Sequence, residues 1–301
     1  MDLERRLVAI GLPLMVAGCS TTPLVGDAGL VQPFSNERQT TLLPHDPPLT
    51  AAYQRRFKRL TFVGIEHTTN PQSASFAAIE KAFDTLQPRA VIVEGFATLW
   101  GPSPSFLLKS LDKPWEQRNS YERGEAFHAV TLAAGRQVPF WGGEPTDSEL
   151  VDRLLAMGSA SADVFAALMF GPLNQDWRSG AFLAPTGPDF EVSYARWAAD
   201  IEQAFANPPP TDLASFQAWY LARFGKPIEA DPEWATRGGP DGDSISERIG
   251  GQSNLLRDRH LFELMLKLTN ERERVLTVFG SSHLANQWDA LKASFGAPIL
   301  R

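Results

Sequence analysis

The feature that most constrains the fold is a strand–helix–strand pattern in the first third of the chain. Residues 60–63 (LTFV) form a short apolar run of the kind found in strands. Residues 73–86 place apolar side chains at helical spacing, and a Gln-Pro pair ends that segment. Residues 90–93 (AVIV) are continuously apolar, as in a strand buried on both faces. We therefore expect a parallel pair of strands joined by a right-handed crossover.

The same alternation of helix and strand returns further along the chain. A helical pattern over 122–134 leads to a third strand at 138–141, where Pro139 favours an early or edge position. A helix over 254–268 and a strand over 275–279 follow much later, and a last helix over 286–294 closes the chain. The predicted fold class is α/β, with a mostly parallel sheet flanked by helices and a helical insertion.

The insertion differs in composition from the segments around it. Residues 150–225 show helical patterns rich in Ala, Phe and Trp, and residues 226–251 are rich in Gly, Pro and Asp. We interpret residues 150–252 as a helical insertion or cap with a mobile loop. The core then consists of a first α/β half at residues 59–149 and a second half at residues 253–301 that completes it.

The N-terminus has the layout of an export signal. Two arginines precede an apolar run over residues 7–17, which is shorter than the ~20 residues that span a bilayer. The run ends in Val-Ala-Gly-Cys19, which looks like the lipobox of bacterial lipoproteins. We predict a signal peptide at 1–18, a lipid on Cys19 and a lipidated tether at 19–58. The alternative is a cytosolic N-terminal helix with a buried cysteine.

Location and charge narrow the set of partners. Ser20 is not the aspartate that favours inner-membrane retention, so we expect a bacterial envelope protein on the outer membrane that faces the periplasm. A net charge of −7 argues against a nucleic-acid partner. The only cysteine is Cys19, which excludes internal disulfides, Fe–S clusters and cysteine-rich zinc sites.

Residues capable of chemistry follow four of the predicted strands. His67 comes after the first strand, Glu94 after the second, Glu144 after the third and His283 after the late strand, each near glycine. Ligand sites in open α/β sheets lie at the carboxyl ends of the strands, so these side chains are expected to converge. The alternative is a chance arrangement without a site. His128 lies on an apolar helix face and is interpreted as a packing residue.

These motifs resemble one superfamily. The two Gly-x-x-His motifs, GIEH and GSSH, with VIVEG between them and NLLRDRHLFELMLKL before the second, are similar to the superfamily of TraB/Tiki proteins, ChaN-like haem-binding lipoproteins and erythromycin-esterase-like enzymes. The similarity covers residues 59–147 and 253–295. It implies a site formed by His67, Glu94, Arg257 and His283, to which we add Glu144 from its position at a strand end.

Helical geometry selects the arginine of that set. Arg257 extends the apolar stripe that continues through Leu261 and Leu264, so it is expected on the core-facing side. Arg259 is placed to pair with Glu263 on a polar face. Asp258 lies beside the stripe and is expected to orient Arg257. The alternative for Arg257 is a surface charge near the start of a helix.

Three kinds of function are compatible with these residues. His67, Glu94 and His283 could hold a divalent metal, Mn²⁺ or Zn²⁺, or one histidine could act as general base without metal. Either scheme predicts a hydrolase of amide or ester bonds in a small-molecule or peptide substrate; Tiki proteins imply the metal-dependent form and the esterases the metal-free form. The alternative is a ChaN-like lipoprotein that binds haem or metal without catalysis. A third option is a structural lipoprotein with a vestigial site.

Overall fold

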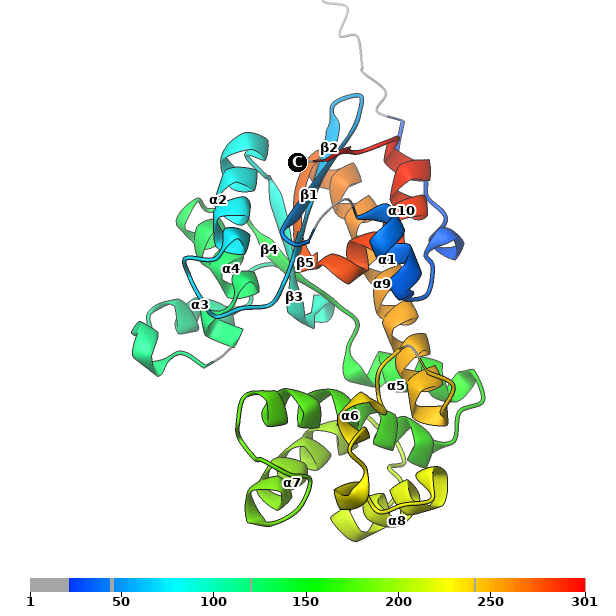
Figure 1. The fold of residues 1–301 in the computed structure, drawn as a ribbon. Helices are drawn as coiled ribbons and strands as arrows, with labels where there is room; N and C mark the ends of the chain where they lie inside the picture. Colours follow the sequence, from blue (N-terminus) through cyan, green and yellow to red (C-terminus); the bar gives the residue numbers. More distant parts are fainter. Residues whose placement is uncertain (1–21, 44–45, 120, 241, 301) are drawn as a thin grey trace, which may run out of the picture.

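A six-stranded sheet forms the centre of the α/β core, as predicted (Figure 1). The structure, a computed structural model, describes residues 22–43, 46–119, 121–240 and 242–300. The order of strands is β4-β3-β5-β2-β1-β6, and the first four run parallel to one another. Only β1 runs antiparallel to its neighbours. The strands are β1 (Leu49–Arg55), β2 (Lys58–Ile65), β3 (Ala90–Ala97), β4 (Phe140–Glu144), β5 (Arg274–Gly280) and β6 (Ile299–Leu300).

The predicted strand–helix–strand unit is present, but its two strands are not paired with each other. After α2 (Ala74–Leu86) the chain enters β3, and β5 lies between β2 and β3 and bonds to both. The expectation of a direct parallel pair is therefore wrong. The central position suits β5, because its run from Val275 to Gly280 is buried throughout. The third predicted strand, β4, is an edge strand as expected from Pro139.

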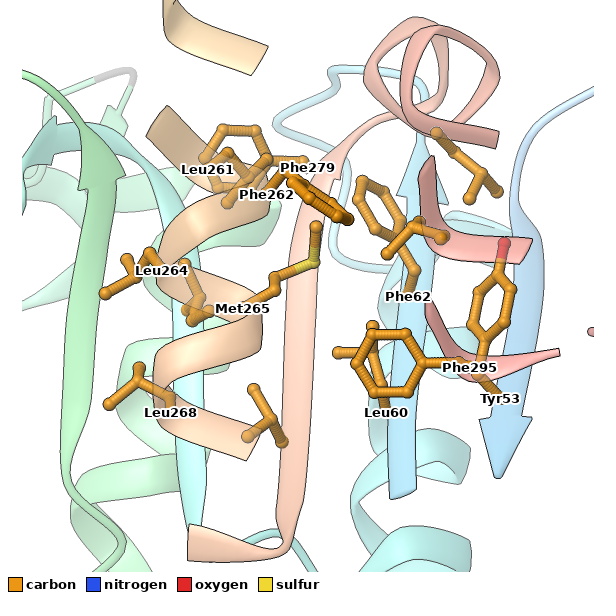
Figure 2. Packing of buried hydrophobic residues seen from close by; sticks show 14 of the residues in the cluster. Tyr53, Leu60, Phe62, Leu261, Phe262, Leu264, Met265, Leu268, Phe279 and Phe295 are labelled. Atoms are coloured by element: carbon orange, nitrogen blue, oxygen red, sulfur yellow. The ribbon is translucent and has the colours of Figure 1, made fainter. Parts of the chain in front are cut away.

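Helices cover both faces of the sheet. On one face α2 and α4 (Glu125–Gly135) pack on the parallel strands, and on the other α9 (Ile245–Arg272) and α10 (Ser281–Phe295) do so. Figure 2 shows the second of these layers, where Phe262 and Met265 of α9 face Phe62 of the sheet. Burial of large apolar side chains on both faces holds the strand ends in a defined position.

The tether predicted at 19–58 is wrong for the residues that the structure describes, 22–43 and 46–58. Leu24 and Val31 are buried in the core, and α1 (Asn36–Leu42) packs on α10. Strand β1 follows and alternates buried Leu49, Ala51 and Tyr53 with less buried residues. Apolar burial outweighs the Thr, Pro and Gly content from which a flexible segment was expected. Cys19 lies outside the described residues.

The insertion is a helical domain with a core of its own (Figure 1). Its helices are α5 (Asp147–Ala156), α6 (Ser161–Arg178), α7 (Pro188–Glu202) and α8 (Leu213–Phe224). The loop predicted at 226–251 is shorter than expected, because Ile228 and Trp234 are buried and α9 already begins at Ile245. The 28-residue α9 therefore joins the cap to the core, which the shorter prediction of 254–268 did not anticipate.

Two further facts complete the architecture. Helix α3 (Ser105–Leu111) lies in the connection between β3 and α4. Across the part of the chain that the structure describes, we find no helix with the length and apolar content needed to cross a membrane.

Candidate functional site

The predicted site residues converge at the carboxyl ends of the parallel strands. His67 lies just beyond β2, Glu94 lies in β3, and Glu144 is the last residue of β4. His283 lies in the first turn of α10, which begins directly after β5. Arg257 reaches the same place from α9. Four neighbouring strands and one helix thus bring together residues that are up to 216 positions apart in the sequence.

Glu94 is the centre of the site. Its Oε2 accepts the Gly280 backbone N–H at 2.8 Å and lies 3.5 Å from Nε2 of His67. Its Oε1 lies 3.7 Å from Nε2 of His283 and 3.8 Å from the guanidinium of Arg257. Burial raises the pKa of Glu94, but polar contact and charge from the two histidines outweigh burial, so the pKa lies well below its ordinary value. Glu94 is therefore ionised at neutral pH.

His283 is held by the buried carboxylate of Asp258, which the sequence had suggested as a partner of Arg257. Its Nδ1 lies 2.7 Å from Oδ1 of Asp258, which is fully buried and also accepts hydrogen bonds from Asn286 at 2.8 Å and Gln287 at 3.0 Å. The expectation that Asp258 orients Arg257 is wrong, because the side chain points to α10. Burial lowers the pKa of His283, yet Asp258 and Glu94 raise it to about 10. His283 is thus a cation at neutral pH.

Arg257 and Glu144 form a bidentate pair. Nε of Arg257 donates to one carboxylate oxygen and an Nη to the other, both at 2.7 Å, and Asn254 accepts a third bond at 3.3 Å. The Glu144 charge raises the pKa of Arg257. Two parallel bonds to a carboxylate fix the plane of the guanidinium. Glu144 therefore positions the arginine, and the Nη that bonds Glu144 also lies 3.8 Å from Oε1 of Glu94.

His67 is the accessible member of the site. Its side chain is 63% exposed, while those of Glu94 and His283 are 16% and 10% exposed. Contact with Glu94 raises the pKa of His67, against a smaller lowering by burial. An exposed imidazole next to a buried anion can exchange protons with water or substrate. This combination is typical of a general base.

Two residues that support the site were not predicted. Glu125, at the start of α4, is buried and accepts the Thr68 backbone N–H at 2.6 Å, which fixes the loop that follows His67. Tyr121 donates its hydroxyl to the backbone oxygen of Glu94 at 3.1 Å. Both lie in a stretch without a strand-end position. The only sign of Glu125 in the sequence was an acidic residue at the start of an otherwise apolar helix. Such a residue is also ordinary in a solvent-exposed turn, so it did not indicate a role in the site.

A cleft of about 670 Å³ adjoins the site, between the strand ends and the helical cap. Of the predicted site residues, Arg257 and Glu144 line this cleft, and Trp100, Asp147, Asp200 and Ile249 are among the other lining residues. The volume lies in the range of small-molecule sites. The lining comes from both the core and the cap, so the cap shapes any ligand that reaches Arg257.

The site differs from a preformed metal centre. Imidazole and carboxylate are suitable ligands for Mn²⁺ or Zn²⁺. However, no group of three His, Cys, Asp or Glu side chains in the described segments is arranged to hold a metal ion. His283 is protonated and directs its two nitrogens toward carboxylates, which leaves no lone pair for a metal. As placed, the side chains do not fit the metal, and the predicted Mn²⁺ or Zn²⁺ stays a prediction.

In comparisons with known proteins, no protein-family model, curated protein or solved structure matches this chain. The resemblance to the TraB/Tiki, ChaN-like and erythromycin-esterase-like superfamily therefore stays a prediction.

Proposed function

We propose that this protein is a hydrolase of ester or amide bonds that uses general acid–base catalysis. The proposal rests on one observation, the chain of contacts from exposed His67 through buried Glu94 to His283 and Asp258, with Arg257 beside it. Such a chain combines an accessible base, a charged partner for that base and a fixed cation.

His67 is the base in this proposal. Its Nε2 faces Glu94, so the other ring nitrogen, Nδ1, takes a proton from a water molecule as the water oxygen attacks the carbonyl carbon of the substrate. Glu94, 3.5 Å away, stabilises the imidazolium that forms. When the tetrahedral intermediate collapses, the same proton passes from His67 to the leaving oxygen or nitrogen. The products are an acid and an alcohol or amine, and no other reactant is needed.

Arg257 and His283 have electrostatic roles. Arg257 is fixed by Glu144 and lines the cleft, so it is placed to stabilise the negative charge that develops on the carbonyl oxygen. His283 is protonated and cannot act as a base near neutral pH. Its charge instead keeps Glu94 ionised, which in turn maintains the basicity of His67.

The test is a hydrolysis assay with a panel of ester, amide and peptide substrates. We expect His67→Ala and Glu94→Gln to lower kcat by about 10²–10⁴-fold, the usual contribution of a positioned acid–base group. His128→Ala is the control, since this histidine lies outside the site and packs on Phe76 with ring centroids 4.8 Å apart. Equal activity in wild type and His67→Ala, or no activity on any substrate, contradicts the proposal.

The same protein samples decide the cofactor. Activity that survives chelator treatment supports the metal-free scheme, and activity that is lost and then restored by Mn²⁺ or Zn²⁺ supports the predicted metal. A Soret band that appears on addition of haem and disappears in His67→Ala, with no hydrolysis, supports the ChaN-like alternative instead.

We propose the same location as the sequence predicts, with a lipid on Cys19 that holds the protein on the periplasmic side of the outer membrane. Metabolic labelling with a radioactive fatty acid tests this directly. Label should be incorporated into the wild type and absent from Cys19→Ser. Equal labelling of both, or of neither, contradicts the prediction.

A further inference from the structure

The described chain begins at the pole of the molecule opposite the site. Thr22 contacts the turn between β1 and β2, where its hydroxyl accepts a bond from Arg56 at 3.1 Å and its backbone oxygen one from Lys58. Leu24 is then fixed by Asn270, near the end of α9, at 2.7 Å. These contacts lie at the amino ends of the parallel strands, whereas the site lies at their carboxyl ends (Figure 1).

This pole is strongly basic. We define the basic pole as residues 54–59, 87–89 and 270–274, which include the turn between β1 and β2, the residues before β3 and the start of β5. These neighbouring segments are joined by backbone bonds from Arg59 to Glu273 at 2.7 Å and from Arg89 to Arg274 at 2.8 Å. They contain seven Lys and Arg residues, of which Lys58 is buried and six are arginines at least partly exposed, and only two acids, Glu271 and Glu273, in a chain whose net charge is −7. Glu273 is already paired with Arg89 at 2.8 Å.

Apolar side chains project from the same pole. Phe57, at the tip of the β1–β2 turn, is 43% exposed, and Val25, three residues beyond Thr22, is 77% exposed. Exposed aromatic and aliphatic tips surrounded by arginines are suited to the headgroup region of a bilayer, where the rings insert and the cations meet phosphates. A nucleic acid would be attracted by the positive charge alone, and its binding would not require exposed apolar side chains.

We infer that the basic pole is a docking surface for an anionic lipid bilayer, and that the candidate site faces away from the membrane. Chain length supports this orientation independently of charge. Three residue steps separate Cys19 from Thr22, and even a fully extended chain covers only about 10 Å over that number. A lipid on Cys19 would therefore hold this pole against the headgroups. This argument from chain length rests on the proposed lipid on Cys19, whereas the argument from charge does not, and neither depends on hydrolase activity.

The experiment uses the full chain with Cys19→Ser, which removes its only cysteine. An environment-sensitive NBD fluorophore is then attached at Phe57→Cys or, as matched control, at Phe106→Cys. Phe106 is 46% exposed, close to the value for Phe57, and belongs to α3 beside Trp100 of the cleft. The probes are vesicles of phosphatidylcholine alone and of phosphatidylcholine with about 30 mol% phosphatidylglycerol, which gives the second kind an anionic surface.

We expect the label at position 57 to shift to the blue with the anionic vesicles and the label at position 106 to remain unchanged. Reversing the charge of Arg56 (Arg56→Glu) should weaken binding by at least about fivefold, the contribution of one arginine near an anionic surface. Arg178→Glu, an exposed charge of the cap, should change binding less than about twofold. High salt should weaken binding of the wild type.

Three outcomes overturn the inference. One is a label at position 57 that does not respond. The second is an equal or larger response at position 106, which would place the exposed aromatics near the cleft against the membrane. The third is an equal effect of Arg56→Glu and Arg178→Glu. An equal loss would show that overall charge causes binding, and no loss in either variant would show that the apolar N-terminal run, present in every sample, causes it.

Discussion

Replacing Asp258 with asparagine should remove most of the pH dependence of folding stability between pH 6 and pH 9. Asp258 is fully buried and accepts bonds from three side chains, of which only His283 titrates. Asparagine has nearly the same shape but no charge. The change therefore isolates the electrostatic part of the contact, at a position that does not touch the proposed substrate cleft.

The magnitude follows from the pKa of His283. Burial lowers that pKa, but Asp258 and Glu94 raise it to about 10, above the ordinary value of 6.5. A raised folded-state pKa stabilises the fold fully below pH 6.5, and this contribution is lost as the pH rises toward 10. Between pH 6 and pH 9 the free energy of unfolding of the wild type should fall by roughly 3 kcal/mol. In Asp258→Asn the fall should be about 1 kcal/mol or less.

The assay is urea unfolding at several pH values between 6 and 9. Asp258→Asn should also lose about 3 kcal/mol at pH 6, because a buried charge pair is broken. The control is Asp231→Asn, a buried aspartate of the cap that accepts the hydroxyl of Tyr220 at 2.6 Å and has no histidine partner. It should lose stability but retain the wild-type slope. A wild-type slope in Asp258→Asn would refute the reasoning.

Two further predictions concern the proposed base and the sheet. If His67 is the base, kcat should rise with pH through the raised pKa of His67. Glu94→Gln should move the midpoint of that rise to lower pH, because the charge that raises the pKa is gone. A pH–rate profile measures the midpoint, and an unchanged midpoint in Glu94→Gln contradicts the prediction. Gly142→Ala should cost about 3 kcal/mol or more, since a Cβ would lie 1.9 Å from the backbone oxygen of Phe96. Gly135→Ala, where an added Cβ has no neighbour within 4 Å, should be neutral or stabilising by up to about 1 kcal/mol, and urea unfolding of both variants measures the difference.

The α/β class could be predicted because local patterns report burial. The AVIV run of β3 is apolar at every position, and the structure buries the strand there on both faces. The order of strands could not be predicted in the same way. The placement of β5 between β2 and β3 depends on backbone pairing between segments 185 and 215 residues apart, for which periodicity holds no information.

The N-terminal error has a different cause. The alternation of Leu49, Ala51 and Tyr53 in β1 was present in the sequence, but the small alanines and the prolines before them concealed it. Burial of Leu24 and Val31 depends on contact with α9 and α10, which are more than 200 residues away. A segment with little local periodicity can be ordered entirely by such contacts.

The sequence by itself determined which side chains stand at the strand ends. His67 and His283 follow β2 and β5, whereas Glu94 lies within β3 and Glu144 ends β4, and parallel strands bring such positions to one edge of a sheet. Only the tertiary structure decided how these groups are charged and which of them pair. Protonation of His283 depends on Asp258, 25 residues away and buried beneath it, because the energy of a charge depends on its surroundings in space.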